Sequence, residues 1–121
     1  MSTGPLLIIW HSRTGTSEQL AQAAHQAAGA DNRLLRAEDA EPEDLLAAGG
    51  YLFCCPENLA SMSGEMKEMF DRCYYPVLGR IEGRPYATVI AAGSDGEGAQ
   101  RQIDRIATGW RLKRVTDRWI V

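Results

Sequence analysis

The chain has 121 residues, of which 13 are Lys or Arg and 16 are Asp or Glu, so its formal net charge is −3. This length predicts one domain over residues 1–121 and excludes a tandem arrangement. Hydrophobic residues make up 45% and charged residues 24%, a composition that excludes disorder and indicates a globular protein. Because the sequence has no basic run, nucleic acid and anionic membranes are excluded as main partners, and a small ligand is expected.

Targeting and redox signals are sparse. The apolar stretch at residues 6–10 is far too short to span a membrane, and no basic segment precedes it as in a signal peptide. Cys54, Cys55 and Cys73 are odd in number and two are adjacent, which fits neither a disulfide framework nor metal-ligand spacing. We therefore expect a cytoplasmic protein with buried free cysteines, no membrane span and no metal site.

The first half of the chain alternates between strand and helix patterns. Residues 6–10 form a continuous apolar run, typical of a strand buried on both faces of a parallel sheet. Small and apolar residues at helical spacing predict a helix over residues 17–28, and a weakly alternating segment predicts a strand over residues 32–37. Pro42 then favours the first turn of a short helix over residues 43–48.

The second half repeats this alternation. Residues 51–55 predict another buried strand, which we expect Pro56 to end because proline cannot donate a ladder hydrogen bond. From Ser63 the apolar residues recur at helical spacing. The remaining elements are a strand over residues 86–92, a helix that buries Ile103, Ile106 and Trp110, and a last strand over residues 112–115.

Alternating strands and helices with buried strands predict the α/β class. Parallel connections are right-handed and carry a helix, so both faces of the sheet are expected to be covered in a three-layer, doubly wound arrangement. Ligands of such sheets bind beyond the carboxyl ends of the strands. The loops after the first, third and fourth predicted strands are therefore the candidate site.

The loop after the first strand has the composition of a phosphate site. Ser12, Thr14, Thr16 and Ser17 supply four hydroxyls around Gly15, at the point where a helix begins. Free backbone N–H groups and the partial positive charge of a helix N-terminus favour an anion there. A polar turn with an ordinary cap is the alternative. The loop lacks the lysine of nucleotide-triphosphate loops and the glycine triplet of dinucleotide folds.

Residues 12–17 resemble the fingerprint of the flavodoxins, hydroxyl-x-Thr-Gly-x-hydroxyl, which wraps the phosphate of FMN in that family. Residues 56–63 and 93–98 are similar to the second and third loops of flavodoxin-like NAD(P)H-dependent FMN reductases. The resemblance implies a five-stranded sheet of order 2-1-3-4-5. It also implies FMN-binding residues in three loops: Ser12, Arg13, Thr14, Gly15, Thr16 and Ser17; Pro56, Glu57, Asn58, Leu59, Ala60 and Ser61; Gly93, Ser94, Asp95 and Gly96.

The resemblance implies hydride transfer from NADH or NADPH to FMN, for which no catalytic side chain is needed. Residues 56–63 and 93–98 contain no aromatic residue, whereas carrier flavodoxins clamp the ring between aromatics, so we favour a reductase of flavin, quinone or a similar aromatic acceptor. An electron carrier that serves a redox partner protein is the first alternative. A domain that binds a phosphorylated metabolite without flavin is the second.

Two single residues of these loops have alternative roles. Glu57 is expected to be an exposed loop carboxylate, with tuning of the flavin ring as the alternative. His11 is expected to be structural rather than a phosphate ligand.

The end of the sequence suggests an assembly. Residues 116–121 are too few for the helix that usually closes a flavodoxin-like sheet, so one sheet face is expected to be partly uncovered. Exposed apolar patches of several hundred Å² usually mark interfaces. We therefore expect a homodimer to which Trp119, Ile120 and Val121 contribute contacts, with a tail that folds back over its own sheet as the alternative.

Overall fold

A computed structural model describes residues 4–93, 95–117 and 119–121. Its strands form one sheet in the order β2-β1-β3-β5-β6, and every neighbouring pair along this path is parallel. The strand bounds are β1 Leu6–Trp10, β2 Asn32–Arg36, β3 Gly50–Asn58, β5 Pro85–Ala91 and β6 Lys113–Arg114. The two remaining strands, β4 Ser61–Met62 and β7 Trp119–Ile120, pair with β3 and β5 respectively. The predicted order is confirmed, because β5 and β6 take the fourth and fifth positions.

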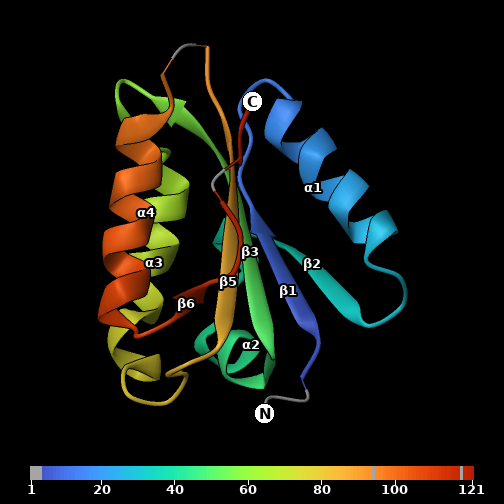
Figure 1. Cartoon of the computed structure of the whole chain (residues 1–121), viewed down its shortest axis with the longest axis vertical. Helices are drawn as coiled ribbons and strands as arrows, with labels where there is room; N and C mark the ends of the chain where they lie inside the picture. The colour runs from blue at the N-terminus through green and yellow to red at the C-terminus, as the bar shows by residue number, and fades with distance from the viewer. Residues whose placement is uncertain (1–3, 94, 118) are drawn as a thin grey trace.

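The helices cover the sheet in two layers. Figure 1 shows α1 on one face of the sheet and α3 with α4 on the other. Their bounds are α1 Thr16–Ala27, α2 Pro42–Ala47, α3 Gly64–Val77 and α4 Glu97–Gly109, with a short 3-10 turn η1 at Ala37–Asp39. The four predicted helices are present. The sequence predicts a starting residue for the first three, and each of these starts within two residues of that position. The arrangement has the three layers that the sequence pattern predicts.

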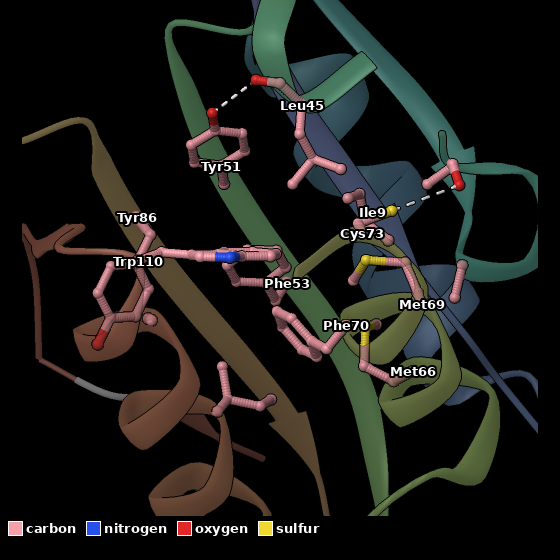
Figure 2. Packing of buried hydrophobic residues seen from close by; sticks show 14 of the residues in the cluster. Ile9, Leu45, Tyr51, Phe53, Met66, Met69, Phe70, Cys73, Tyr86 and Trp110 are labelled. Atoms are coloured by element: carbon pink, nitrogen blue, oxygen red, sulfur yellow. Dashed lines mark hydrogen bonds between the residues drawn. The ribbon is translucent and has the colours of Figure 1, made fainter. Parts of the chain in front are cut away.

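The larger core lies between the sheet and the pair α3 and α4, and aromatic side chains dominate it (Figure 2). The ring of Phe53 on β3 lies 5.0 Å from that of Phe70 on α3, which lies 5.5 Å from Trp110 at the end of α4. Their tilted ring pairs are the favoured aromatic geometry and add about 0.5–1.5 kcal/mol each beyond the burial of area. This chain of rings fixes both helices against the central strand.

A polar network holds α4 to the far edge of the sheet. The Asp104 carboxylate accepts a hydrogen bond of 2.7 Å from the Tyr86 hydroxyl and an ion-paired one of 3.1 Å from Arg114 on β6. Gln100, one turn earlier, bonds to Asp104 and accepts from the buried Thr88 hydroxyl. Burial raises the pKa of the Tyr86 hydroxyl, and its hydrogen bond to Asp104 adds to this effect. The tyrosine therefore remains a donor to the carboxylate.

The smaller core lies under α1. Ile8, Leu52, Cys54 and Val89 point to this face and are buried together with Ala21 of α1. Within the described residues, α1 is the helix that covers this face (Figure 1). The two faces of the sheet thus have cores of unequal size.

The expected end of the third strand at Pro56 is wrong. β3 continues to Asn58, and Pro56 pairs with Ala91 of β5. Residues two apart in a strand direct their N–H and C=O groups toward the same neighbouring strand. The Cys54 carbonyl accepts a hydrogen bond from the His11 amide and therefore faces β1. Pro56, two residues later, has its nitrogen on the same side. The nitrogen of Pro56 therefore faces the side on which β1 has already ended, so its missing N–H breaks no ladder.

The expected fifth strand over residues 112–115 is present as β6, which is shorter than expected and covers Lys113–Arg114. A further short strand that the sequence did not predict, β7, pairs with the same edge of β5 at Val89 and Ile90. The segment after the predicted strand thus extends the sheet sideways instead of folding over its face. The expected absence of a closing helix stays a prediction.

None of the helices in the described part of the chain combines the length and the apolar character needed to cross a membrane.

Candidate functional site

A cleft of about 390 Å³ lies at the carboxyl edge of the sheet, where the sequence predicts the site. It opens between the start of α1, the end of β3 and the loop after β5. Its lining residues are Ser12, Arg13, Thr14, Thr16, Ser17, Pro56, Glu57, Asn58, Ala91, Ala92, Gly93 and Val121. All three predicted loops therefore contribute to one cavity.

Some predicted residues lie in these loops without lining the cleft, and some lining residues were not predicted. Gly15, Leu59, Ala60, Ser61, Asp95 and Gly96 belong to the first group, whereas Ser94 lies outside the described residues. The second group is Ala91, Ala92 and Val121. Figure 1 shows the C-terminal end of the chain beside the start of α1, which explains how Val121 reaches the cleft.

The N-terminus of α1 is open toward the cleft. Gly15 has a φ of 102°, which a side chain would strain, and its N–H donates to the Ser12 hydroxyl at 2.9 Å. No side chain caps the helix. Ser17 in its first turn is 2% exposed and lines the cleft, and its buried hydroxyl has no hydrogen-bond partner among the described residues. A buried hydroxyl without a partner beside unused N–H groups suits an anion.

The N-terminus of α4 is closed by Glu57. One carboxylate oxygen accepts from the Gly96 amide at 2.9 Å and the other from the Ala99 amide at 3.0 Å. The expectation that Glu57 is an exposed loop carboxylate is wrong, because the extension of β3 carries this side chain across to α4. Glu57 thereby ties the second loop to the third. Among the described residues, the first turn of α1 lines the cleft without a capping side chain, whereas amides at the start of α4 are bonded to Glu57.

The two outer loops contain strained backbone. Leu59 and Ala60, the two central residues of the hairpin between β3 and β4, have φ of 51° and 65°. Asp95 in the third loop has a φ of 46°. Positive φ costs a residue other than glycine about 1–3 kcal/mol, and such residues cluster at functional sites. The Glu57 carboxylate joins both strained loops and helps to hold them.

Among the described residues, no cysteine lines the cleft and no metal site is found. Burial raises the pKa of the Cys54 and Cys55 thiols to about 12 and that of Cys73 to about 11, so they remain protonated and unreactive. No group of three His, Cys, Asp or Glu side chains in the described ranges could hold a metal ion. His11 lies 3.4 Å from the Glu65 carboxylate, on the α3 side, and does not line the cleft.

This geometry agrees with what the chain is similar to. Its fold is that of the flavodoxin-like FMN proteins. The chain belongs to the family described as NADPH-dependent FMN reductase, which matches residues 41–117. It is also 30% identical over 123 residues to a flavodoxin of Aquifex aeolicus (strain VF5), covering 94% of this chain but only 66% of that protein.

Solved structures support the fold. A flavodoxin from the domain Archaea superposes with a TM-score of 0.81 at 15% identity, covering 97% of this chain and 83% of the other. An NADPH-quinone reductase from P. pentosaceus superposes with a TM-score of 0.74 at 16% identity, covering 98% and 84%. At such identities the likeness shows the fold, which carriers and reductases share.

Replacement of Glu57 tests the connection between the two loops. Glu57→Ala leaves two amides at the start of α4 without their charged acceptor, so we expect the free energy of unfolding to fall by at least about 1.5 kcal/mol. Glu57→Gln keeps one acceptor oxygen and should lose less. The measurement is urea denaturation of the purified variants.

The matched control is Glu82→Ala. Glu82 is exposed, and its carboxylate lies 3.6 Å from Arg111, a surface pair worth under about 1 kcal/mol. If Glu57→Ala and Glu82→Ala lowered the free energy of unfolding equally, the Glu57 contacts would stabilise the protein no more than a surface ion pair does.

Proposed function

We propose that the chain binds FMN with its phosphate at residues 12–17 and its ring between residues 56–61 and 93–96. The unpartnered Ser17 hydroxyl at the open N-terminus of α1 is the observation that carries this proposal. The closed N-terminus of α4 supports it, because only one anion position remains. A single phosphate suits FMN rather than FAD, since the loop has no dinucleotide fingerprint.

We further propose that the protein is an NAD(P)H-dependent reductase of flavin, quinone or a similar aromatic acceptor. When bound, FMN supplies hydride and electron transfer through its ring system. The residues of this chain would bind and orient the cofactor: the first loop would hold the phosphate, and the second and third loops would supply the walls for the ring. No side chain needs to move a proton for this chemistry.

The open side of the cleft favours a reductase over a carrier. None of the described side chains that line it is aromatic. The ring face would thus remain open to a flat partner such as nicotinamide or the acceptor. An electron-carrier role with a redox partner protein is the alternative, supported by the similarity to a flavodoxin. A domain that binds a phosphorylated metabolite is the weaker alternative, since it leaves the second and third loops without a role.

The proposed location of the protein is the cytoplasm.

Ser17→Ala tests the phosphate position. The variant removes one hydrogen bond to a charged group, so we expect FMN affinity to fall by about 1–3 kcal/mol, or about 5- to 150-fold in Kd. Stability without FMN should not fall, because the hydroxyl has no protein partner to lose. Fluorescence titration of the apoprotein measures Kd, with Thr108→Ala on α4 as control. An unchanged Kd for Ser17→Ala would place the phosphate elsewhere.

Anaerobic stopped-flow mixing tests the reductase. We expect NADPH or NADH alone to bleach the bound flavin, whereas a carrier would need a separate reductase protein. Gly93→Trp should slow this bleaching more than it weakens FMN binding, because Gly93 lines the cleft and a Cβ there meets no atom within 4 Å. Gly64→Trp, which also meets no atom within 4 Å, is the control. No bleaching by either nicotinamide leaves the carrier role as the better proposal.

We also propose that a second copy covers the face beside α1. An apolar groove of about 190 Å³ includes Leu6, Leu52, Ala87 and Val115, and Val115 is 64% exposed. Light scattering at micromolar concentration should give a dimer mass, and Val115→Glu should give a monomer because it places a charge in the apolar contact. Thr108→Glu, on α4, should remain dimeric. A monomer mass for the unaltered protein would contradict the proposal.

A further inference from the structure

We propose that a groove between α3 and α4, lined by Arg101 and Arg105, binds the adenosine 2′-phosphate end of NADPH. This inference rests on the proposed reductase function and assigns to the same site a determinant of nucleotide specificity. None of the groove residues lines the cleft of about 390 Å³, although Ala60 belongs to the second loop beside it.

The groove consists of two adjoining hollows. The first, of about 260 Å³, starts at the flavin-site loops and is lined by Ala60, Gly98, Arg101, Gln102 and Arg105. The second, of about 430 Å³, is lined by Met62, Lys67, Tyr74, Gln102, Arg105 and Ile106. Gln102 and Arg105 line both hollows, so the two hollows adjoin along α4, and the second also contacts Lys67 and Tyr74 of α3.

Charge is the strongest feature of this groove. Most arginines in the described ranges pair with a carboxylate or donate to backbone carbonyls, as Arg72 does with Glu68 and Arg84 with the end of α2. Arg101 and Arg105 both line the groove. Among the described residues, neither of them has an ion pair or a hydrogen bond. They lie one helical turn apart on α4, so their guanidinium groups share a face. Lys67 adds a third cation, held 2.7 Å from Asp71.

These groups match the chemistry of a phosphorylated adenosine. Arginine is well suited to phosphate because its planar fork donates two parallel hydrogen bonds. Tyr74 and Ile106 provide an aromatic and an aliphatic surface in the second hollow, against which a flat base can pack. NADH carries no 2′-phosphate, so the two arginines would favour NADPH over NADH.

The groove and the FMN cleft lie on either side of the same hairpin. The Gly98 backbone is in such close contact with the Ala60 carbonyl that a Cβ at Gly98 would collide with this oxygen. Leu59, at the tip of the turn, is fully exposed. A dinucleotide with its nicotinamide over the open ring face would therefore cross this turn to place its other end between α3 and α4.

Charge reversal in the groove tests the inference on the FMN-loaded protein. Isothermal titration uses 2′,5′-ADP as the probe and thus does not depend on turnover. We expect Arg101→Glu and Arg105→Glu each to raise its Kd about tenfold or more, since each removes a charge-assisted contact. The Kd of FMN should not change, and the KM for NADPH should rise far more than that for NADH.

Lys113→Glu is the matched control. Lys113 on β6 is also exposed, and it has no ion pair among the described residues. Its replacement by glutamate changes the net charge by the same amount as the arginine variants, but away from the groove. We expect it to change the Kd of 2′,5′-ADP less than twofold. No binding of 2′,5′-ADP, an unchanged Kd in both arginine variants, or equal weakening by Lys113→Glu would overturn the inference. Failure of the reductase proposal is read separately, from anaerobic flavin reduction in the unaltered protein.

Discussion

The carboxylate of Glu57 is the contact on which the geometry of the cleft depends. β3 extends beyond the end of β1, so that Glu57 reaches the Gly96 and Ala99 amides at the start of α4. One side chain therefore connects the central strand, the strained hairpin and the loop after β5. It also offsets the partial positive charge at the start of α4, whereas the first turn of α1 has no side-chain cap. In the proposed binding mode, the N-terminus of α4 has a structural role and that of α1 binds the ligand.

The architecture could be predicted from the sequence because hydrophobic runs and helical periodicity are local signals. Residues 6–10 and 51–55 are apolar throughout, which is typical of a strand covered on both faces. The errors arose where neighbours decide the outcome. Pro56 stays in β3 because β1 has ended beside it, and the short β7 forms because β5 offers an unused edge. Neither fact is encoded in the segment itself.

The candidate site was predictable to a similar extent. Hydroxyl density and the position after a buried strand identified the first loop, and the cleft does lie there. The role of Glu57 was missed because its partners lie 39 and 42 residues away. Val121 was missed because its place depends on the pairing of β7. The family match over residues 41–117 includes the second and third loops but not residues 12–17, so the two kinds of signal are independent.

The two short strands beside β5 have a consequence for solubility during folding. A sheet edge exposes unused N–H and C=O groups, and a long flat edge can recruit a strand from another molecule. Here the edge beside β5 is formed by two separate two-residue strands, β6 and β7. Of these, β6 consists of the exposed cationic residues Lys113 and Arg114. The opposite edge, β2, carries exposed Arg33 and Arg36. One edge of the sheet is therefore interrupted and both edges carry charged side chains. These features disfavour pairing with a strand of another molecule and growth into cross-β aggregates.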